Sequence, residues 1–129
     1  MRKVTLLFSL LSLTIPCHAV DQVVRSGETS TIPIDLLNDG DRAIVEEGGV
    51  LTTDGASAIT VNDDNQTALN QGTISTINNN NHGIHNNGKD NAVITNSGRI
   101  STTGSTANGI FNDGGVNAVI TNSGLISTT

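Results

Sequence analysis

The sequence is poor in aromatic residues and in cysteine, and each shortage excludes a class of protein. It has no Trp, no Tyr and two Phe in 129 residues, and Phe111 is the only aromatic residue outside the N-terminal stretch. Grooves that stack bases or sugars on aromatic rings are therefore not expected. With a single Cys, the chain cannot form an internal disulfide framework. Its length allows one small domain.

Basic residues are also scarce. Six Lys and Arg stand against 12 Asp and Glu, which gives a formal net charge of -6. Arg2 and Lys3 lie in a segment that we expect to be removed, and without them the net charge falls to near -8. An acidic chain is repelled by phosphate backbones and by anionic membranes. We therefore expect no nucleic-acid partner.

Residues 1–19 have the three-part layout of a secretory signal peptide. A basic start is followed by an apolar run over 4–15, and the small residues Cys17 and Ala19 precede the expected cleavage site. The run is too short to cross ~30 Å of hydrocarbon as a membrane anchor. We predict export with cleavage after Ala19, leaving a mature chain without cysteine, as suits an oxidising compartment.

A long internal repeat dominates the second half of the chain. Residues 92–102 return as 118–128, and only Arg99 and Leu125 differ among the eleven positions. Weaker copies begin near residues 70 and 43, and the step from Gly49 to Gly72 is shorter than the others, which a shortened turn explains. A fixed period of about 26 residues is typical of solenoids, in which each repeat forms one structural unit.

Each repeat contains three short β-prone pieces, at 92–95, 99–102 and 109–112, bounded by Asn, Ser and Gly. No segment shows helical periodicity. We therefore predict an all-β, parallel β-helix of about three to four rungs over residues 43–129. A rung here is one turn of the chain around the axis, stacked ~4.8 Å above the last. Residues 20–42 do not fit the repeat, and we expect an N-terminal cap there, with Pro33 blunting a pairing edge.

Stacking at this period predicts three apolar columns that meet along the axis as the core, where each buried Ile contributes about 1.5–3 kcal/mol. A column here is the set of residues at equivalent positions in successive rungs. The first expected column holds Val45, Ala68, Ile94 and Ile120; the second holds Leu51, Ile74, Ile100 and Ile126; the third holds Ile59, Ile84 and Ile110, with a one-residue shift at Ile59.

Polar turn positions recur at the same period. Asn side chains in register can hydrogen-bond amide to amide along the axis, as in other stacked sheets, and a following Gly can take a left-handed conformation. Variable residues such as Lys89, Arg99 and Asp113 are expected to face outward. The expected ladder consists of Asn70, Asn96 and Asn122, followed by Gly72, Gly98 and Gly124.

No catalytic, cofactor-binding or metal-binding constellation emerges from these patterns. Asp64 and Asp90 lie one repeat apart, but the next equivalent is Val116, so a solvated turn is the better interpretation than an acid pair. His82 and His85 are separated by two residues, a spacing that is not expected to place both rings on one side of a strand. We interpret them as exposed turn histidines and predict no bound metal or cofactor.

Two hydroxyl columns leave a further binding mode open. Flat arrays of outward Thr on a β-helix can bind ice, but adjacent residues of a strand point to opposite sides. Here Ser fills one of the two ranks, which weakens this alternative. The columns are Ser75, Ser101 and Ser127 beside Thr76, Thr102 and Thr128.

The signal-peptide layout together with Ile-Thr-Asn-Ser-Gly-x-Ile-Ser-Thr resembles the passenger regions of bacterial autotransporters. It is also similar to filamentous, haemagglutinin-like surface proteins of Gram-negative bacteria. The resemblance covers roughly residues 43–129 and is clearest at 91–102 and 117–128. It implies a right-handed β-helix that a C-terminal membrane β-barrel carries to the cell surface, where many members act as adhesins and others carry enzymes in added domains.

These 129 residues lack the alternating, aromatic-girdled strands of such a barrel. We therefore expect the repeats to continue in a longer protein, with end-to-end stacking on a partner as the alternative that covers the last strand. The expected function is that of an exported, non-enzymatic surface protein, an adhesin or structural stalk with an unidentified host or cell-surface ligand. Without a barrel, the expected location is the periplasm. The alternatives are a β-helical domain or fragment acting on polysaccharide and, less favoured, an ice-binding β-helix.

Overall fold

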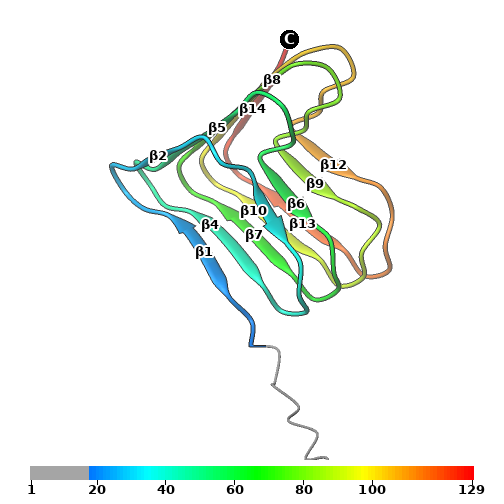
Figure 1. Ribbon diagram of the computed structural model, residues 1–129. Coiled ribbons are helices and arrows are strands. Elements are labelled where there is room, and N and C mark those ends of the chain that lie inside the picture. Colours follow the sequence, from blue (N-terminus) through cyan, green and yellow to red (C-terminus); the bar gives the residue numbers. More distant parts are fainter. Residues whose placement is uncertain (1–17) are drawn as a thin grey trace, which may run out of the picture.

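The computed structural model describes residues 18–129, which form an all-β solenoid of about four rungs (Figure 1). The predicted parallel β-helix with a period near 26 residues is thereby confirmed. Most of the predicted signal peptide, residues 1–17, lies outside the described residues, so its cleavage stays a prediction.

Fourteen strands in the described part of the chain form three parallel sheets. Sheet A contains β1 (Asp21–Val24), β4 (Arg42–Val45), β7 (Thr67–Asn70), β10 (Val93–Asn96) and β13 (Val119–Asn122). Sheet B contains β2 (Thr29–Ser30), β5 (Val50–Thr53), β8 (Thr73–Ile77), β11 (Arg99–Thr103) and β14 (Leu125–Thr128). Sheet C contains β3 (Ile34–Leu36), β6 (Ile59–Val61), β9 (Ile84–Asn86) and β12 (Ile110–Asn112).

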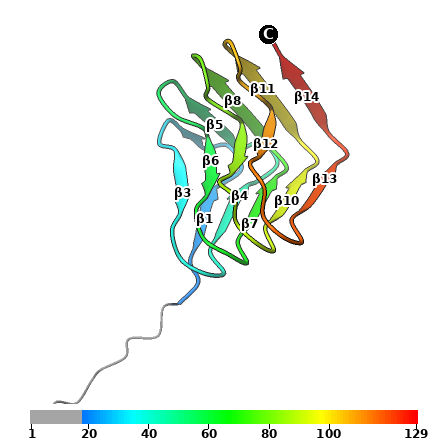
Figure 2. The same cartoon turned by 90° about the vertical axis from the view of Figure 1, so that its right-hand side faces the viewer.

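Every strand pairs with its equivalent in the next rung, so the sheets run along the solenoid axis (Figure 2). The last two rungs keep the full repeat, and Ile100 pairs with Ile126. The older step is shorter, because Leu51, and not Gly48, pairs with Ile74. The shortened turn expected from the sequence accounts for this difference.

The core follows the period-2 alternation of the strands, in which alternate side chains point to opposite faces. Residues of the second and third expected columns are stacked in register, and Ile74, Ile84 and Ile100 are fully buried. Ile110 and Ile126, in the last rungs, are partly buried against this core. The interior is thus a continuous apolar column system that only stacking can bury.

The first expected column is wrong at one position. Ala43, not Val45, pairs with Ala68, and the column continues through Ile94 to Ile120. Val45 pairs with Asn70 and therefore lies below the Asn column. Both residues are apolar and two positions apart, so both face inward, and alternation alone cannot choose between them.

Residues 20–42, expected as a cap outside the repeat, form the first rung itself. Strands β1, β2 and β3 pair in parallel with β4, β5 and β6. Two of the inward positions of this rung are nevertheless polar. Gln22 lies at the base of the first column and donates a hydrogen bond to the backbone oxygen of Asp35, while Ser30 lies below Leu51. The first rung therefore closes the base of the core with polar side chains.

The regular spacing of Gly72, Gly98 and Gly124 has a different cause from the one expected. None of the three is among the residues with positive φ. A Cβ at Gly98 would instead overlap the carbonyl oxygen of Gly72 in the rung below, and a Cβ at Gly124 would overlap that of Gly98. Glycine is required here because successive backbones approach closely. The left-handed turn positions are taken largely by Asn, at Asn65 and Asn91 among others.

Candidate functional site

The side chains best suited to chemistry gather on the outer face of sheet C. His85 of β9 pairs in register with Phe111 of β12, and His82 precedes β9. The His82 ring stacks on Phe111 with a centroid distance of 4.5 Å, and the two His rings meet edge to face at 5.2 Å. We call these three residues the His–Phe cluster. They link the third and fourth rungs.

His82 is held between rungs by its hydrogen bonds. Its backbone N–H donates to Ser57 Oγ at 3.0 Å, in the rung below. Its Nδ1 accepts the backbone N–H of Asn108 at 3.0 Å, in the rung above. An acceptor at Nδ1 implies a neutral ring that carries its proton on Nε2. The cluster therefore clasps neighbouring rungs while its histidines are neutral.

The environment disfavours the charged form of both rings. Burial lowers the pKa of His82 below its usual 6.5, and the charge of neighbouring His85 lowers it further. Burial also lowers the pKa of His85, although Asp113 acts in the opposite direction. His85 Nε2 is buried without a hydrogen-bond partner. These groups are poor candidates for a charged binding site.

The expectation of exposed histidines on different sides is wrong. His82 is only 9% exposed, and both rings lie on one side of sheet C. The bend at Gly83 separates His82 from the regular alternation of β9, which is why the spacing misled the sequence interpretation. Among residues 18–129, no group of three His, Cys, Asp or Glu side chains could hold a metal ion.

The two lowered pKa values predict a pH-dependent stability. Because the folded values lie below the unfolded value of about 6.5, the unfolded chain binds more protons in this window. Stability should be complete above that pH and fall as the pH drops toward the folded values. We expect a lower thermal midpoint at pH 5 than at pH 7, measured by circular dichroism.

The matched variant for this prediction is His82→Asn, whose Oδ1 can accept the Asn108 N–H but does not titrate. It should show a weaker pH dependence than the parent chain, and the double variant that also replaces His85 should be nearly flat between pH 5 and 7. An unchanged slope in the double variant would show that other groups control acid stability.

The expected amide ladder lies inside the solenoid. Asn70 and Asn96 are fully buried, and Asn70 Nδ2 donates to Asn96 Oδ1 at 2.7 Å. Asn96 Nδ2 donates in turn to Asn122 Oδ1 at 2.7 Å. Every donor points toward the later rung, so the lower end of the ladder leaves Asn70 Oδ1 buried above Val45 without a partner.

Two further ladders were not anticipated. On sheet C, buried Asn86 donates to Asn112 Oδ1 at 2.7 Å, again toward the later rung. Outside the core, Asn91 Nδ2 donates to Asn65 Oδ1 at 3.0 Å, toward the earlier rung, and Asn117 continues this ladder. Each of these pairs is separated by one full repeat, so applying the offset to every Asn would have found them.

The Asn96→Leu substitution tests the buried ladder. Leu has a similar volume but leaves Asn122 Oδ1 without its donor and removes the acceptor of Asn70 Nδ2. An unsatisfied buried amide costs about 1–3 kcal/mol, so we expect a loss of that size in urea unfolding. Gln71→Leu, at an exposed position next to the ladder, is the control and should change stability by less than about 0.5 kcal/mol.

The aspartates spaced by one repeat also have a structural role. Asp64 Oδ1 accepts the backbone N–H of Asp90 at 2.9 Å, and Asp90 Oδ1 accepts that of Val116 at 2.6 Å. Each carboxylate thus holds the corner of the next rung. Asp41 holds a corner at the base. Although its burial acts to raise the value, hydrogen bonds from the N–H groups of Val20 and Asn38 and from the Asn38 side chain hold its pKa below the usual range.

The hydroxyl columns are divided between the two faces of sheet B. Ser75 and Ser101 pair in register and are half-buried on the outer face, whereas Thr76 and Thr102 are buried. Thr76 Oγ1 donates to the carbonyl oxygen of Asn81. A double rank of outward Thr is therefore not formed by these residues. Of the variable positions expected outside, Arg99 and Asp113 are exposed and Lys89 is half-buried.

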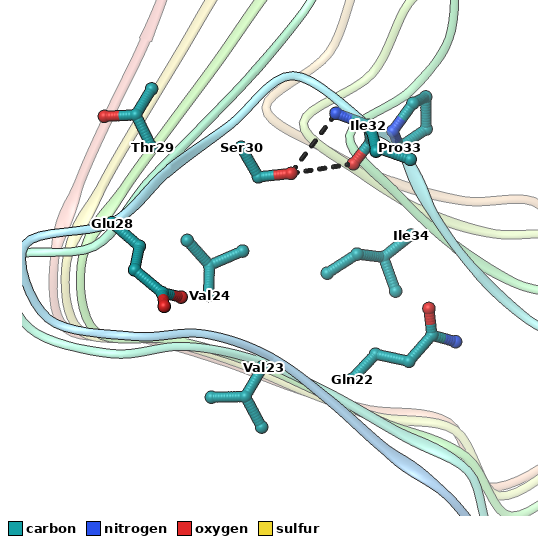
Figure 3. A pocket seen from close by; sticks show the side chains of 9 residues that line it. All are labelled: Gln22, Val23, Val24, Glu28, Thr29, Ser30, Ile32, Pro33 and Ile34. Atoms are coloured by element: carbon teal, nitrogen blue, oxygen red, sulfur yellow. Dashed lines mark hydrogen bonds between the residues drawn. The ribbon is translucent and has the colours of Figure 1, made fainter.

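A hollow opens at the base of the solenoid, inside the first rung (Figure 3). Val24 and Ile34 point into it, while Val23 points away. Ser30 Oγ closes one side by accepting the N–H of Ile32 at 3.2 Å. This hollow is the uncovered end of the apolar core.

We find no match for the chain among protein-family models, curated proteins or solved structures. Function is therefore inferred from the geometry above. Across residues 18–129 there is no helix of the length and apolarity needed to cross a membrane.

Proposed function

We propose that this chain is an exported, non-enzymatic surface protein whose solenoid serves as an adhesive or structural stalk. The observation that carries the proposal is the unbroken register of the last rungs. Ser75, Ser101 and Ser127 repeat the same outward position, rung after rung. A surface that presents one chemical pattern at each strand spacing of ~4.8 Å suits multivalent contact or spacing.

The acids that could favour an enzyme are engaged in the scaffold. Asp64 and Asp90 each accept a backbone N–H from the following rung. The rest of the surface in the last rungs is built of amide and hydroxyl side chains, and residues 114–129 carry no charged side chain. This pattern supports a passenger-like stalk over an acid-base catalyst.

Export is tested by expressing the full chain in a Gram-negative host and determining the N-terminus of the product by mass spectrometry. The proposal predicts a product that begins at Val20 and is found outside the cytoplasm. Ala19→Lys removes the small residue before the cleavage site and should leave the precursor unprocessed. A full-length cytoplasmic product from the parent chain would contradict the proposal.

The adhesive role is tested with immobilised polysaccharides and with fixed cells. We expect the purified chain to be retained by at least one surface and to release no soluble sugar from it. Release of oligosaccharide on incubation would favour the polysaccharide-acting alternative instead.

A further inference from the structure

The two ends of the solenoid differ in chemistry. At the base, the inward positions of the first rung include the polar residues Gln22 and Ser30, β2 is two residues long, and Pro33 lacks an N–H. These are devices that blunt a pairing edge. At the opposite end, β12, β13 and β14 form the last rung described here, and we call their uncovered side the upper end face.

The upper end face is apolar and uncharged. Ile120 is 44% exposed and Leu125 53% exposed, and Ile126 is only partly buried. Residues 114–129 include no Asp, Glu, Lys or Arg. Contiguous apolar side chains beside unpaired strand edges are typical of an interaction surface.

The amide ladders give this face a polarity. Both buried ladders donate toward it, from Asn96 to Asn122 and from Asn86 to Asn112. Asn122 Nδ2 is left with a long 3.3 Å contact to the carbonyl oxygen of Gly124. An Asn side chain placed one strand spacing further along would offer Oδ1 to this donor, as Asn122 does to Asn96.

From this geometry we propose that the upper end face docks the first rung of a second, different β-solenoid chain. That rung would place apolar side chains over Ile110, Ile120 and Ile126 and Asn side chains over Asn112 and Asn122. Parallel strand addition supplies the backbone hydrogen bonds, and the alternate side chains supply the selectivity.

A second copy of this chain does not match the face. In the register of sheet A, its Gln22 would lie over Ile120 and its Val24 over Asn122. Ser30 would lie over Ile126 by the register of sheet B. Each of these pairs opposes a polar group to an apolar one, which penalises self-assembly.

The probe for this proposal is a synthetic peptide of residues 92–117, which carries Ile94, Ile100 and Ile110 with Asn96 and Asn112. Amide exchange of the ¹⁵N-labelled chain is followed by NMR with and without unlabelled peptide. We expect at least tenfold slower exchange in β13 and β14 and no change in β1 and β2. A peptide with Asn96→Leu and Asn112→Leu should bind at least tenfold more weakly.

Variants of the chain separate the ladder from general stickiness. Asn122→Asp keeps the size of the exposed side chain but loses the amide donor, and it should weaken peptide binding at least tenfold. Gln71→Ala should leave binding unchanged. The proposal is overturned by equal binding of the two peptides, by no protection at saturating peptide, or by protection of β13 and β14 through self-association when no peptide is present.

Discussion

Replacing Ile100 by Ala should destabilise the chain by about 2–5 kcal/mol, the range for truncating a fully buried Leu or Ile. Ile100 is completely buried and lies between Ile74 and Ile126 in the second column. The cavity cannot collapse easily, because the backbones of neighbouring rungs are fixed by parallel hydrogen bonds. Urea unfolding followed by circular dichroism measures the change as a lower midpoint.

Leu125→Ala is the matched control for Ile100→Ala. Leu125 occupies the next rung on the same sheet but is 53% exposed. Its truncation should change stability by no more than about 0.5 kcal/mol. Similar losses for the two variants would mean that Ile100 is not in a shared interior.

Gly98→Ala should be at least as damaging, with an expected loss of about 3 kcal/mol or more, the upper part of the range for overpacking. A Cβ there would overlap the carbonyl oxygen of Gly72 and the backbone of Gln71, neither of which can move without opening the sheet. The φ angle at Gly98 is not positive, so the cost is one of space rather than backbone conformation. The measurement is again the urea midpoint.

Gly55→Ala provides the contrast, because a Cβ at Gly55 meets nothing within 4 Å and its φ is also not positive. This variant should be neutral or slightly stabilising, since Ala restricts the unfolded chain more than Gly does. If Gly98→Ala were equally harmless, the close stacking of successive rungs at the Gly72–Gly98–Gly124 corner would be refuted.

The sequence was informative where the repeat is strong. The offset of the repeat predicts the pairing of Ile100 with Ile126 and the ladder from Asn70 to Asn122, because identical side chains in register are the physical requirement of a stacked solenoid. It failed in the oldest rungs. There Val45 replaces Asn, so nothing in the chemistry indicated which of Ala43 and Val45 continues the apolar column.

The candidate site was harder to predict than the fold. The proximity of His82 to His85 depends on a bend at Gly83, which alternation along a regular strand does not reveal. Phe111, by contrast, follows His85 by one repeat, so this contact was available from the offset. The role of Gly98 also escaped prediction, since turn chemistry and close backbone approach favour the same residue.

Methyl NMR of an isoleucine-labelled sample tests the stacking most directly. We expect nuclear Overhauser contacts from Ile100 to both Ile74 and Ile126, which flank it in neighbouring strands. Contacts from Ile100 to neither residue, in a folded sample with assigned methyl groups, would contradict the solenoid register and with it the proposals for function and docking.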